Sequence, residues 1–362
     1  MIGARKASAM FFGAMMFLSL LFPTSYVVES PGLVINVMGQ EDDRPIIDFS
    51  NSSIFQSNTR LYMTTVSSSG DPQLGAFSWQ VAAGLLMDGY QVIPVRLLYP
   101  EETSVQVHEK TAKQMLNSQE TAAVMGVEKA GYHVTMKLTI SGCEKGSEAD
   151  EKLQAGDHII SLSYNGKAKK IDSFAALNVF LSSVPVGKEV EITYMRGDEE
   201  RKDTITTLSF SPNTVGYARA GSRLGISVNT EDVQMPLEVN FHLGDIGGPS
   251  AGLMLSIGVY DYLTQGSLGE TQKIAGTGTI SLSGEVGAIG GIKHKMQGAK
   301  NEGARYFIAP ALNCDDVVGN VPSGLSVYAV HTLDQAIYTV RSIGRQDVTG
   351  LLTCEMVVNK SK

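Results

Sequence analysis

The feature that most restricts the fold of this chain is a glycine-rich turn between a strand and an apolar helix. Residues 237–243 alternate as a strand does, residues 244–252 read GDIGGPSAG, and residues 253–263 are strongly apolar. Such a turn places Ser250 at a helix start, where its hydroxyl is exposed and free backbone N–H groups converge. The helix dipole adds a positive field at that point. An ordinary helix cap has the same sequence, so this turn alone indicates no chemistry.

A second segment places a lysine on the apolar face of a helix. Strand-like residues 274–280 and a hairpin turn at 284–287 come first, and a helix begins near residue 292. Four residues share one face of it, at i, i+3, i+4 and i+7: Ile292, Lys295, Met296 and Ala299. A charged lysine on such a face is costly, and burial or a helix amino terminus lowers its pKa. Lys295 is therefore a candidate general base, and Ser250 is the candidate nucleophile.

These two segments resemble the proteolytic domain of Lon proteases. The shared motifs, in order, are GPSAG at 248–252, Thr277-Gly278, IGGIKHK at 289–295 and a strand at 303–310. The resemblance implies an α/β (α+β) proteolytic domain. It also implies a Ser–Lys dyad of Ser250 and Lys295, in which the lysine amine takes the hydroxyl proton.

The resemblance also assigns supporting residues around the dyad. Thr277 matches the threonine that holds the lysine, and Gly248 and Ala251 belong to the loop whose amides would stabilise an oxyanion. His242 resembles a histidine near the site of the family, although a half-buried strand histidine bonded to backbone explains it equally well. Two residues stand where the family commonly has an acidic side chain: Gly247 and Thr279.

Residues 128–212 resemble a PDZ domain of the bacterial protease type. The match rests on an alternating strand at 132–140, GSEAD at 146–150, LQAGDHII at 153–160, an Asn-Gly turn and a helix at 173–181. A PDZ domain binds peptides by adding them as a strand to an open sheet edge. The resemblance places that edge at four residues: Gly131, Tyr132, His133 and Val134. The carboxylate loop typical of PDZ domains is not evident, so we expect capture of extended segments; a purely structural module is the alternative.

The first 28 residues predict a membrane anchor. Arg5 and Lys6 precede a run without charge from Ala7 to Val28, which is long enough to cross the ~30 Å hydrocarbon layer as a helix. The basic pair would keep the amino terminus in the cytoplasm and place the rest on the extracytoplasmic side of the cell membrane. A cleaved signal peptide, with secretion of the remainder, is the alternative.

Charge and motif content exclude several classes of ligand. The net charge of −8 and the lack of a clustered basic stretch argue against nucleic acid. No G-x-x-x-x-G-K-[ST] motif occurs, so we expect no ATP, and no cofactor is indicated. Cys143, Cys314 and Cys354 form no zinc pattern, and no metal site is expected. Free thiols are favoured over a single disulfide.

Together these features predict a PDZ-containing, membrane-anchored, Lon-like protease, similar to a group found in Gram-positive bacteria. Five divisions are predicted: an anchor or signal peptide at 1–28, a mixed α/β region at 29–127 that packs on the proteolytic domain, a PDZ domain at 128–212, the proteolytic domain at 213–345 and a C-terminal appendage at 346–362. We expect an ATP-independent serine endopeptidase whose PDZ domain recruits exported or membrane-associated proteins, and Lon-type domains also suggest a homo-oligomer. The alternative is a non-catalytic membrane scaffold that binds proteins through both domains.

Overall fold

The central sheet is assembled from two distant parts of the chain. The structure, a computed structural model, describes residues 2–41, 43–50, 54–87, 89–100, 102–264 and 266–360. The sheet has six strands in the order β20-β19-β16-β5-β1-β6. Three strands come from the first third of the chain and three from the last: β1 (Tyr26–Asn36), β5 (Arg60–Ser69), β6 (Gln91–Pro94), β16 (Lys273–Gly276), β19 (Tyr306–Pro310) and β20 (Ser326–Val330). β5, β16, β19 and β20 are parallel, and β1 is antiparallel to both of its neighbours.

Helices cover both faces of this sheet because its strands alternate two sets of apolar side chains. Leu61 and Met63 of β5 pack into one buried cluster, with α7 and α10, while Tyr62 between them packs into another, with α8 and α11. Phe307 and Ile308 of β19 alternate in the same way. The covering helices are α7 (Gly252–Leu263), α10 (Leu333–Gly344), α8 (Ile292–Asn301) and α11 (Cys354–Lys360). The result is a three-layer sandwich, and the mixed α/β class predicted from the sequence is confirmed.

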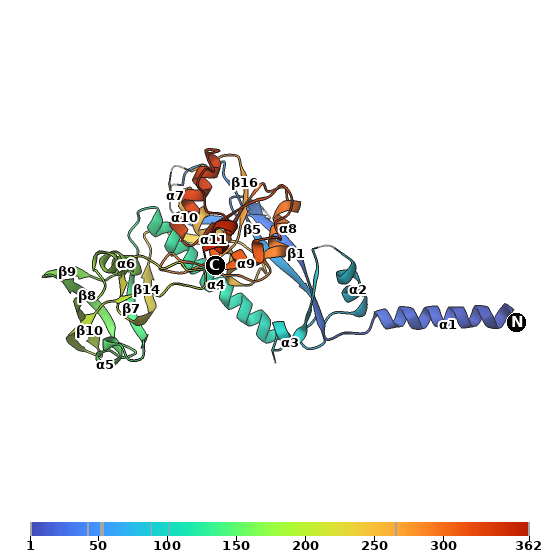
Figure 1. Cartoon of the computed structure of the whole chain (residues 1–362), viewed down its shortest axis with the longest axis horizontal. Coiled ribbons are helices and arrows are strands. Elements are labelled where there is room, and N and C mark those ends of the chain that lie inside the picture. The colour runs from blue at the N-terminus through green and yellow to red at the C-terminus, as the bar shows by residue number, and fades with distance from the viewer. Residues whose placement is uncertain are drawn as a thin grey trace.

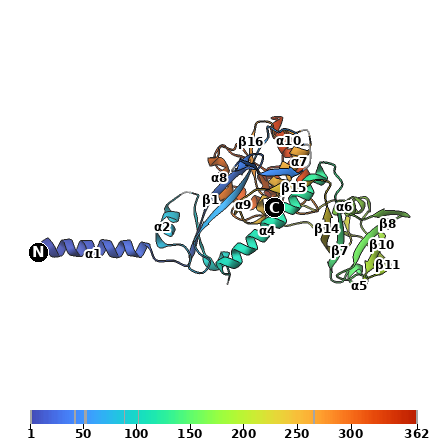
Figure 2. The ribbon, with the colours of Figure 1, turned by 180° about the vertical axis from the view of Figure 1, so that it is seen from behind.

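A long helix, α4 (Ser104–Lys129), runs past the sandwich and leads out of it (Figure 2). It begins at a capping box, in which the Thr103 hydroxyl accepts from the Gln106 amide and the Gln106 side chain accepts from the Thr103 amide. It lies close to α7, since a Cβ atom added at Gly126 would be 2.5 Å from the Cβ of Val259. Glycine therefore permits the approach of the two helices, which fixes α4 against α7.

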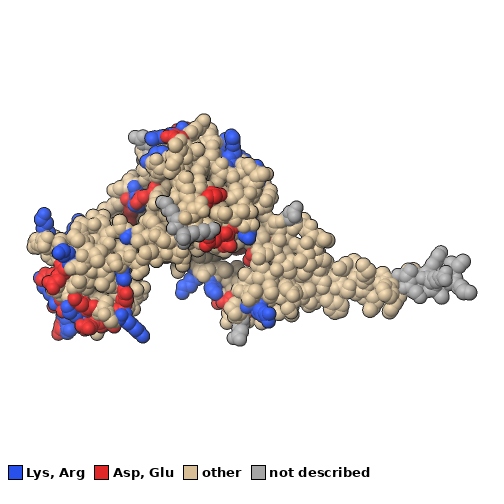
Figure 3. All heavy atoms as spheres, in the orientation of Figure 1, with Lys and Arg blue, Asp and Glu red and all other residues tan. Residues whose placement is uncertain are grey.

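A second sheet is inserted in the chain after α4. Its strands lie in the order β11-β10-β8-β7-β14, and β9 pairs with β8. The elements are β7 (Thr135–Cys143), α5 (Glu148–Lys152), β8 (His158–Tyr164), β9 (Lys167–Lys170), α6 (Phe174–Ser183), β10 (Glu189–Arg196), β11 (Glu199–Thr206) and β14 (Ile226–Gln234). We call residues 135–234 the inserted module. Figure 1 shows it at one side of the sandwich, and Figure 3 shows charged side chains of both signs gathered over it.

Short elements complete the fold. They are β2 (Gln40–Glu41), β3 (Arg44–Pro45), β4 (Ile47–Ser50), α2 (Ser78–Leu86), α3 (Val95–Leu98), β12 (Leu208–Ser209), β13 (Ser222–Arg223), β15 (Glu238–Phe241), η1 (Pro249–Ala251), β17 (Thr279–Ile280), β18 (Val286–Gly287), η2 (Ala311–Asn313) and α9 (Cys314–Val317). Among them, β15 pairs with β4 just before the glycine-rich turn.

The predicted membrane anchor is wrong. The amino-terminal helix, α1 (Ile2–Leu20), projects from the rest of the molecule (Figure 1). It ends at Leu20, shortly before Pro23, a residue type that disfavours a continuing helix, and Pro23 forms a backbone bridge with Phe77. The uncharged part of the helix, from Ala7 to its end, rises about 21 Å, against a hydrocarbon layer of ~30 Å. Within the described residues no helix combines the length and the apolar character that crossing a membrane requires. The predicted single-pass localisation is contradicted with it.

Helix α11 packs into the sandwich through Cys354 and Val357, within the segment predicted from the sequence to be an appendage. Cys314, at the start of α9, forms a disulfide with Cys354, at the start of α11. This corrects the expectation that these two thiols are free. The pairing depends on how α11 packs against α9, which a separation of 40 residues does not reveal. Cys143 remains a free thiol, and burial raises its pKa.

Candidate active site

The glycine-rich turn presents Ser250 between β15 and α7. Gly248 has a φ of +89°, a conformation that glycine adopts readily and other residues rarely adopt. Pro249 then begins the short helix η1, where its missing N–H is not needed. Ser250 and Ala251 follow, and the chain continues directly into α7. The serine hydroxyl therefore lies at the start of a continuous helical stretch, as the sequence predicts.

Helix α4 holds one side of this turn. The Gly248 amide donates to the Thr111 carbonyl at 2.9 Å. About two helical turns further along α4, the Ser118 hydroxyl donates to the Pro249 carbonyl at 3.0 Å. These contacts fix the backbone immediately before the serine. They were not anticipated, because α4 lies far upstream and its sequence carries no signal for them.

Thr277 also holds the glycine-rich turn, at the carbonyl of Ser250. Its hydroxyl donates to the Ser250 carbonyl at 3.1 Å and accepts from Lys295 Nζ at 3.2 Å. The Gly278 amide donates to the same carbonyl at 2.9 Å. Thr277 is fully buried. One threonine thus connects the backbone of the serine with the side chain of the lysine.

Helix α8 directs Lys295 at the serine. The helix starts after Gly291, whose φ of +65° is left-handed, and Lys295 lies in its first turn. The lysine is 4% exposed. Its Nζ atom donates to Ser250 Oγ at 2.6 Å. The apolar face predicted for α8 is also buried, including Ile292, Met296 and Ala299.

The environment of Lys295 favours the neutral amine. Burial lowers the pKa of Lys295 from 10.5 to about 8, and the negative charge of Glu29 opposes this by raising the pKa. Desolvation is therefore the larger cause, since it penalises the ammonium form. A pKa of about 8 leaves a useful fraction of neutral amine near pH 7. A hydroxyl 2.6 Å from such an amine can lose its proton to it.

The segment with this geometry matches a known family. Residues 227–341 match the sequence model of the Lon protease (S16) C-terminal proteolytic domain. This part of the chain is a Lon-type proteolytic domain. The match begins inside the inserted module and ends in α10, so it covers the glycine-rich turn, Thr277 and Lys295.

Curated Lon proteases are similar over the same region. Lon protease 1 of Sorangium cellulosum is 32% identical over 169 residues, which are 44% of this chain and 19% of that protein. Lon protease 2 of Bacillus subtilis is 33% identical over 102 residues, 28% of this chain and 18% of that protein. The chain thus spans about a fifth of the length of these relatives. The similarity to these Lon proteases identifies the matched region as a serine peptidase domain.

Solved structures show a likeness to PDZ domains. The PDZ domain of an SdrC-like protein from Listeria monocytogenes is 22% identical with a TM-score of 0.21, and the alignment covers 25% of this chain and 85% of that one. The corresponding domain from Listeria innocua is 20% identical with a TM-score of 0.21, covering 26% and 97%.

Two residues predicted to support the dyad, His242 and Gly248, make other contacts than expected. His242 donates its backbone N–H to the Ile46 carbonyl at 2.9 Å, and within the described residues its side chain makes no hydrogen bond to either member of the dyad. The Gly248 amide is already bonded to Thr111. The amides of Ser250 and Ala251 stand at the helix start, where a helix leaves its N–H groups without an intrahelical acceptor.

A histidine and a glutamate beside Lys295 were missed by sequence reasoning. His294 is buried, and its Nδ1 lies 2.8 Å from the Gly89 carbonyl, so Nδ1 carries the proton. Its Nε2 lies 3.7 Å from the Glu29 carboxylate and has no hydrogen-bond partner among the described residues. Glu29 is also the residue whose charge raises the pKa of Lys295. The only available signal was the position of His294 next to the lysine.

The peptide-binding edge predicted at Gly131, Tyr132, His133 and Val134 is not an open edge. Val134 is buried, and β7, which follows at Thr135, is paired on one side with β8 and on the other with β14. Tyr132 and His133 are exposed at the end of α4, outside the sheet. The strand at this edge of the module is β14. The prediction failed because β14 comes 90 residues later in the sequence than the segment it covers.

Proposed function

We propose that this chain is a serine endopeptidase in which Ser250 is the nucleophile and Lys295 the general base. The observation that carries the proposal is the buried, partly neutral amine 2.6 Å from the serine hydroxyl. Thr277 is a positioning residue, because its hydroxyl contacts both the lysine amine and the serine carbonyl. The similarity to Lon-type domains supports the same assignment.

The reaction follows from the positions of these groups. Ser250 Oγ attacks the carbonyl carbon of the scissile bond while its proton moves to Lys295 Nζ. The negative charge that develops on the carbonyl oxygen is stabilised by the Ser250 and Ala251 amides and by the positive end of α7. The protonated lysine then gives its proton to the leaving amine, and an acyl-enzyme remains. Water, deprotonated by the neutral lysine, attacks the ester carbonyl and releases the acid and the free serine.

We further propose that this hydrolysis needs no nucleotide. Nucleophile, base and oxyanion donors are all supplied by the dyad and its turn, and peptide hydrolysis does not require an energy source. Cleavage of a short peptide by the purified chain should therefore proceed at the same rate with and without added ATP and Mg²⁺. A strict ATP requirement would contradict this part of the proposal.

We propose that residues 29–127 and 235–345 form one folded unit that the inserted module interrupts. The shared six-stranded sheet supports this division, since β5 pairs with β16, a strand from beyond the module, and β5 carries β1 and β6 in the same sheet. The module would recruit flexible polypeptide segments by strand addition. Its accepting edge is β14 rather than the predicted Gly131–Val134.

The test is cleavage of an unfolded protein by the full chain. The wild type should degrade reduced, alkylated casein, whereas Ser250→Ala and Lys295→Ala should each lose at least about 1,000-fold of the rate. Lys293→Ala is the matched control, because Lys293 is two positions away on the same helix and exposed. Full activity of Lys295→Ala would show that another base acts. Absence of cleavage by the wild type would favour a binding role.

A further inference from the structure

A cavity of about 610 Å³ lies where the inserted module meets the sandwich. One wall is α4, with Leu116 and Val124, and the opposite wall is the module, with Met136 and Val233. Leu282 contributes a further apolar side chain. Apolar side chains from both units therefore line the cavity beside polar ones, and neither the dyad nor Thr277 lines it.

β15 lines the cavity, and one of its two edges has no partner among the described strands. Residues 239–242 line the cavity, and within the described part of the chain β15 pairs with β4 alone. The His242 amide points toward β4, where it bonds to the Ile46 carbonyl. Because backbone groups alternate along a strand, the N–H and C=O groups of Val239 and Phe241 point the other way, to the open edge. An extended polypeptide can pair with that edge as an added strand.

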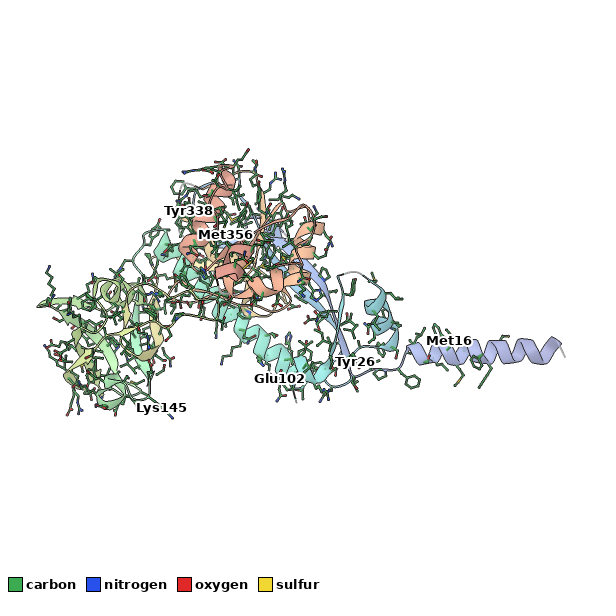
Figure 4. All side chains as sticks on the ribbon, in the orientation of Figure 1. Met16, Tyr26, Glu102, Lys145, Tyr338 and Met356 are labelled. Atoms are coloured by element: carbon green, nitrogen blue, oxygen red, sulfur yellow. A yellow bond between two sulfur atoms is a disulfide. The ribbon has the colours of Figure 1, made fainter. Side chains whose placement is uncertain are left out.

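The cavity continues toward the glycine-rich turn. A second hollow of about 250 Å³ shares Leu116 and Gln119 with it and extends along α4 to Gly247. The Gly248 amide is bonded to Thr111, so the hollow ends beside the turn that holds Ser250. The distance along α4 from Val124 to Thr111 is about 20 Å, the reach of about six extended residues. In Figure 4, Glu102 is labelled just before the start of α4, and Lys145 is labelled on the inserted module.

The charge of the lining is acidic. Asp48 and Glu120 line the cavity, and no lysine or arginine does. Among the described residues neither carboxylate is in an ion pair or a side-chain hydrogen bond. A bound segment with lysine or arginine beside its apolar residue would meet these carboxylates, whereas an acidic segment would be repelled.

We infer that the cavity and the hollow form the substrate cleft, and that the cleft selects extended polypeptide segments in which a bulky apolar side chain is flanked by lysine or arginine. The inference rests on the proposed function and gives it a substrate class. The apolar side chain enters the space between α4 and the module, the backbone pairs with β15, and the segment continues along α4 to Ser250. Residues of the module thereby take part in recognition at the cleft itself.

Two quenched fluorescent peptides that differ only in their flanking residues, lysine in one and glutamate in the other, test this selection. With the full-length wild type, kcat/KM should be at least about 10-fold higher for the lysine peptide. Glu120→Gln and Asp48→Asn should each reduce that ratio by about 3- to 5-fold, and 1 M salt should reduce it as well. Glu109→Gln is the matched control, because Glu109 is an exposed acid on α4 that lines neither hollow.

The outcomes separate this inference from the proposed function. A small serine-directed fluorophosphonate does not fill the cleft, so it should label Ser250 equally in the wild type and in the Glu120→Gln and Asp48→Asn variants. Normal labelling with no preference for the lysine peptide, or a ratio unchanged in the Asp48→Asn/Glu120→Gln double variant, would overturn the inference and leave the proposed function intact. A wild type that neither labels nor cleaves would remove the proposed function itself.

A binding measurement locates the peptide directly. The full-length Ser250→Ala variant is irradiated with the lysine peptide carrying a benzophenone at its apolar position. Cross-links should map to α4 between residues 116 and 124, to residues 239–242 and to Met136. Cross-links confined to module surfaces away from the cavity would contradict the assignment.

Discussion

The hydroxyl of Ser118 donates a hydrogen bond to the carbonyl of Pro249, 3.0 Å away and 131 residues later in the chain. Ser118 lies on α4, before the inserted module and outside the segment that matches the Lon family, whereas Pro249 directly precedes the nucleophile. The turn that presents Ser250 is therefore held by a helix from the other side of the module. The site is complete only when both parts of the chain come together.

Replacing Ser118 with alanine should slow the acylation of Ser250 markedly while lowering the free energy of unfolding only slightly. The buried hydroxyl is lost and the Pro249 carbonyl loses its donor, which costs about 1 kcal/mol of stability. The turn becomes freer to move, so we expect the labelling rate of Ser250 by a fluorophosphonate to fall about 5- to 50-fold. Ser182→Ala is the control, because that serine also bonds to a helical carbonyl, Val179, but lies in α6 of the module. Equal labelling rates in the two variants would show that α4 does not position the turn.

The contact between α4 and α7 gives a stability prediction. In Gly126→Ala the new Cβ would lie 2.5 Å from the Cβ of Val259, so the helices must separate at a cost of about 1–3 kcal/mol. Val259→Ala should restore part of this loss in the double variant, since it removes the Cγ1 atom that lies 2.6 Å from the new Cβ, although the Cβ of residue 259 remains. Denaturant unfolding measures both effects. Gly142→Ala serves as the control, because nothing lies within 4 Å of a Cβ at that position. Purely additive losses in the double variant would argue against the close contact.

The rate of cleavage should depend on pH through Lys295. The neutral amine is the base, and burial lowers the pKa of this lysine to about 8. We therefore expect kcat/KM to rise about 10-fold per pH unit below that value and to level off above it. We would measure kcat/KM between pH 5.5 and 9.5 with a peptide that has no titratable side chains. A rate that is constant over this range, or that falls as pH rises, would exclude a lysine base.

The charge of Glu29 should influence the midpoint of the pH profile of kcat/KM. Its charge raises the pKa of Lys295, so Glu29→Gln should move the midpoint of the profile to lower pH. The rate at pH 7 should then increase roughly 2- to 5-fold, because more of the amine is neutral. Glu41→Gln, at an exposed position on β2, should leave the midpoint in place. If both variants gave the wild-type midpoint, the charge of Glu29 would not act on the base.

Local sequence patterns predicted much of this site. The spacing within α8 put Lys295 on the buried face, and the structure brings it to Ser250 and Thr277 as expected from the motif order. Each of these residues lies in a segment whose own sequence fixes its conformation: a glycine turn, a strand end and a helix start. The mixed α/β class followed from the same segments.

The features that the sequence did not predict depend on contacts between residues far apart in the chain. Beyond the amino-terminal helix Pro23 pairs with Phe77, and the edge of the module is β14 because that strand returns to cover β7. The disulfide of Cys314 and Cys354 likewise depends on the packing of α11. In each case the deciding partner lies dozens of residues away, and no local pattern identifies it.

The most direct test of the dyad is the mass of the intact chain after reaction with a fluorophosphonate, followed by peptide mapping of the adduct. We expect one adduct per chain in the wild type at pH 8.5, located on Ser250. We expect the same adduct in Lys293→Ala and a labelling rate reduced at least about 100-fold in Lys295→Ala. An adduct on a different residue, or labelling of Lys295→Ala at the wild-type rate, would contradict the assignment of Ser250 and Lys295 as a dyad.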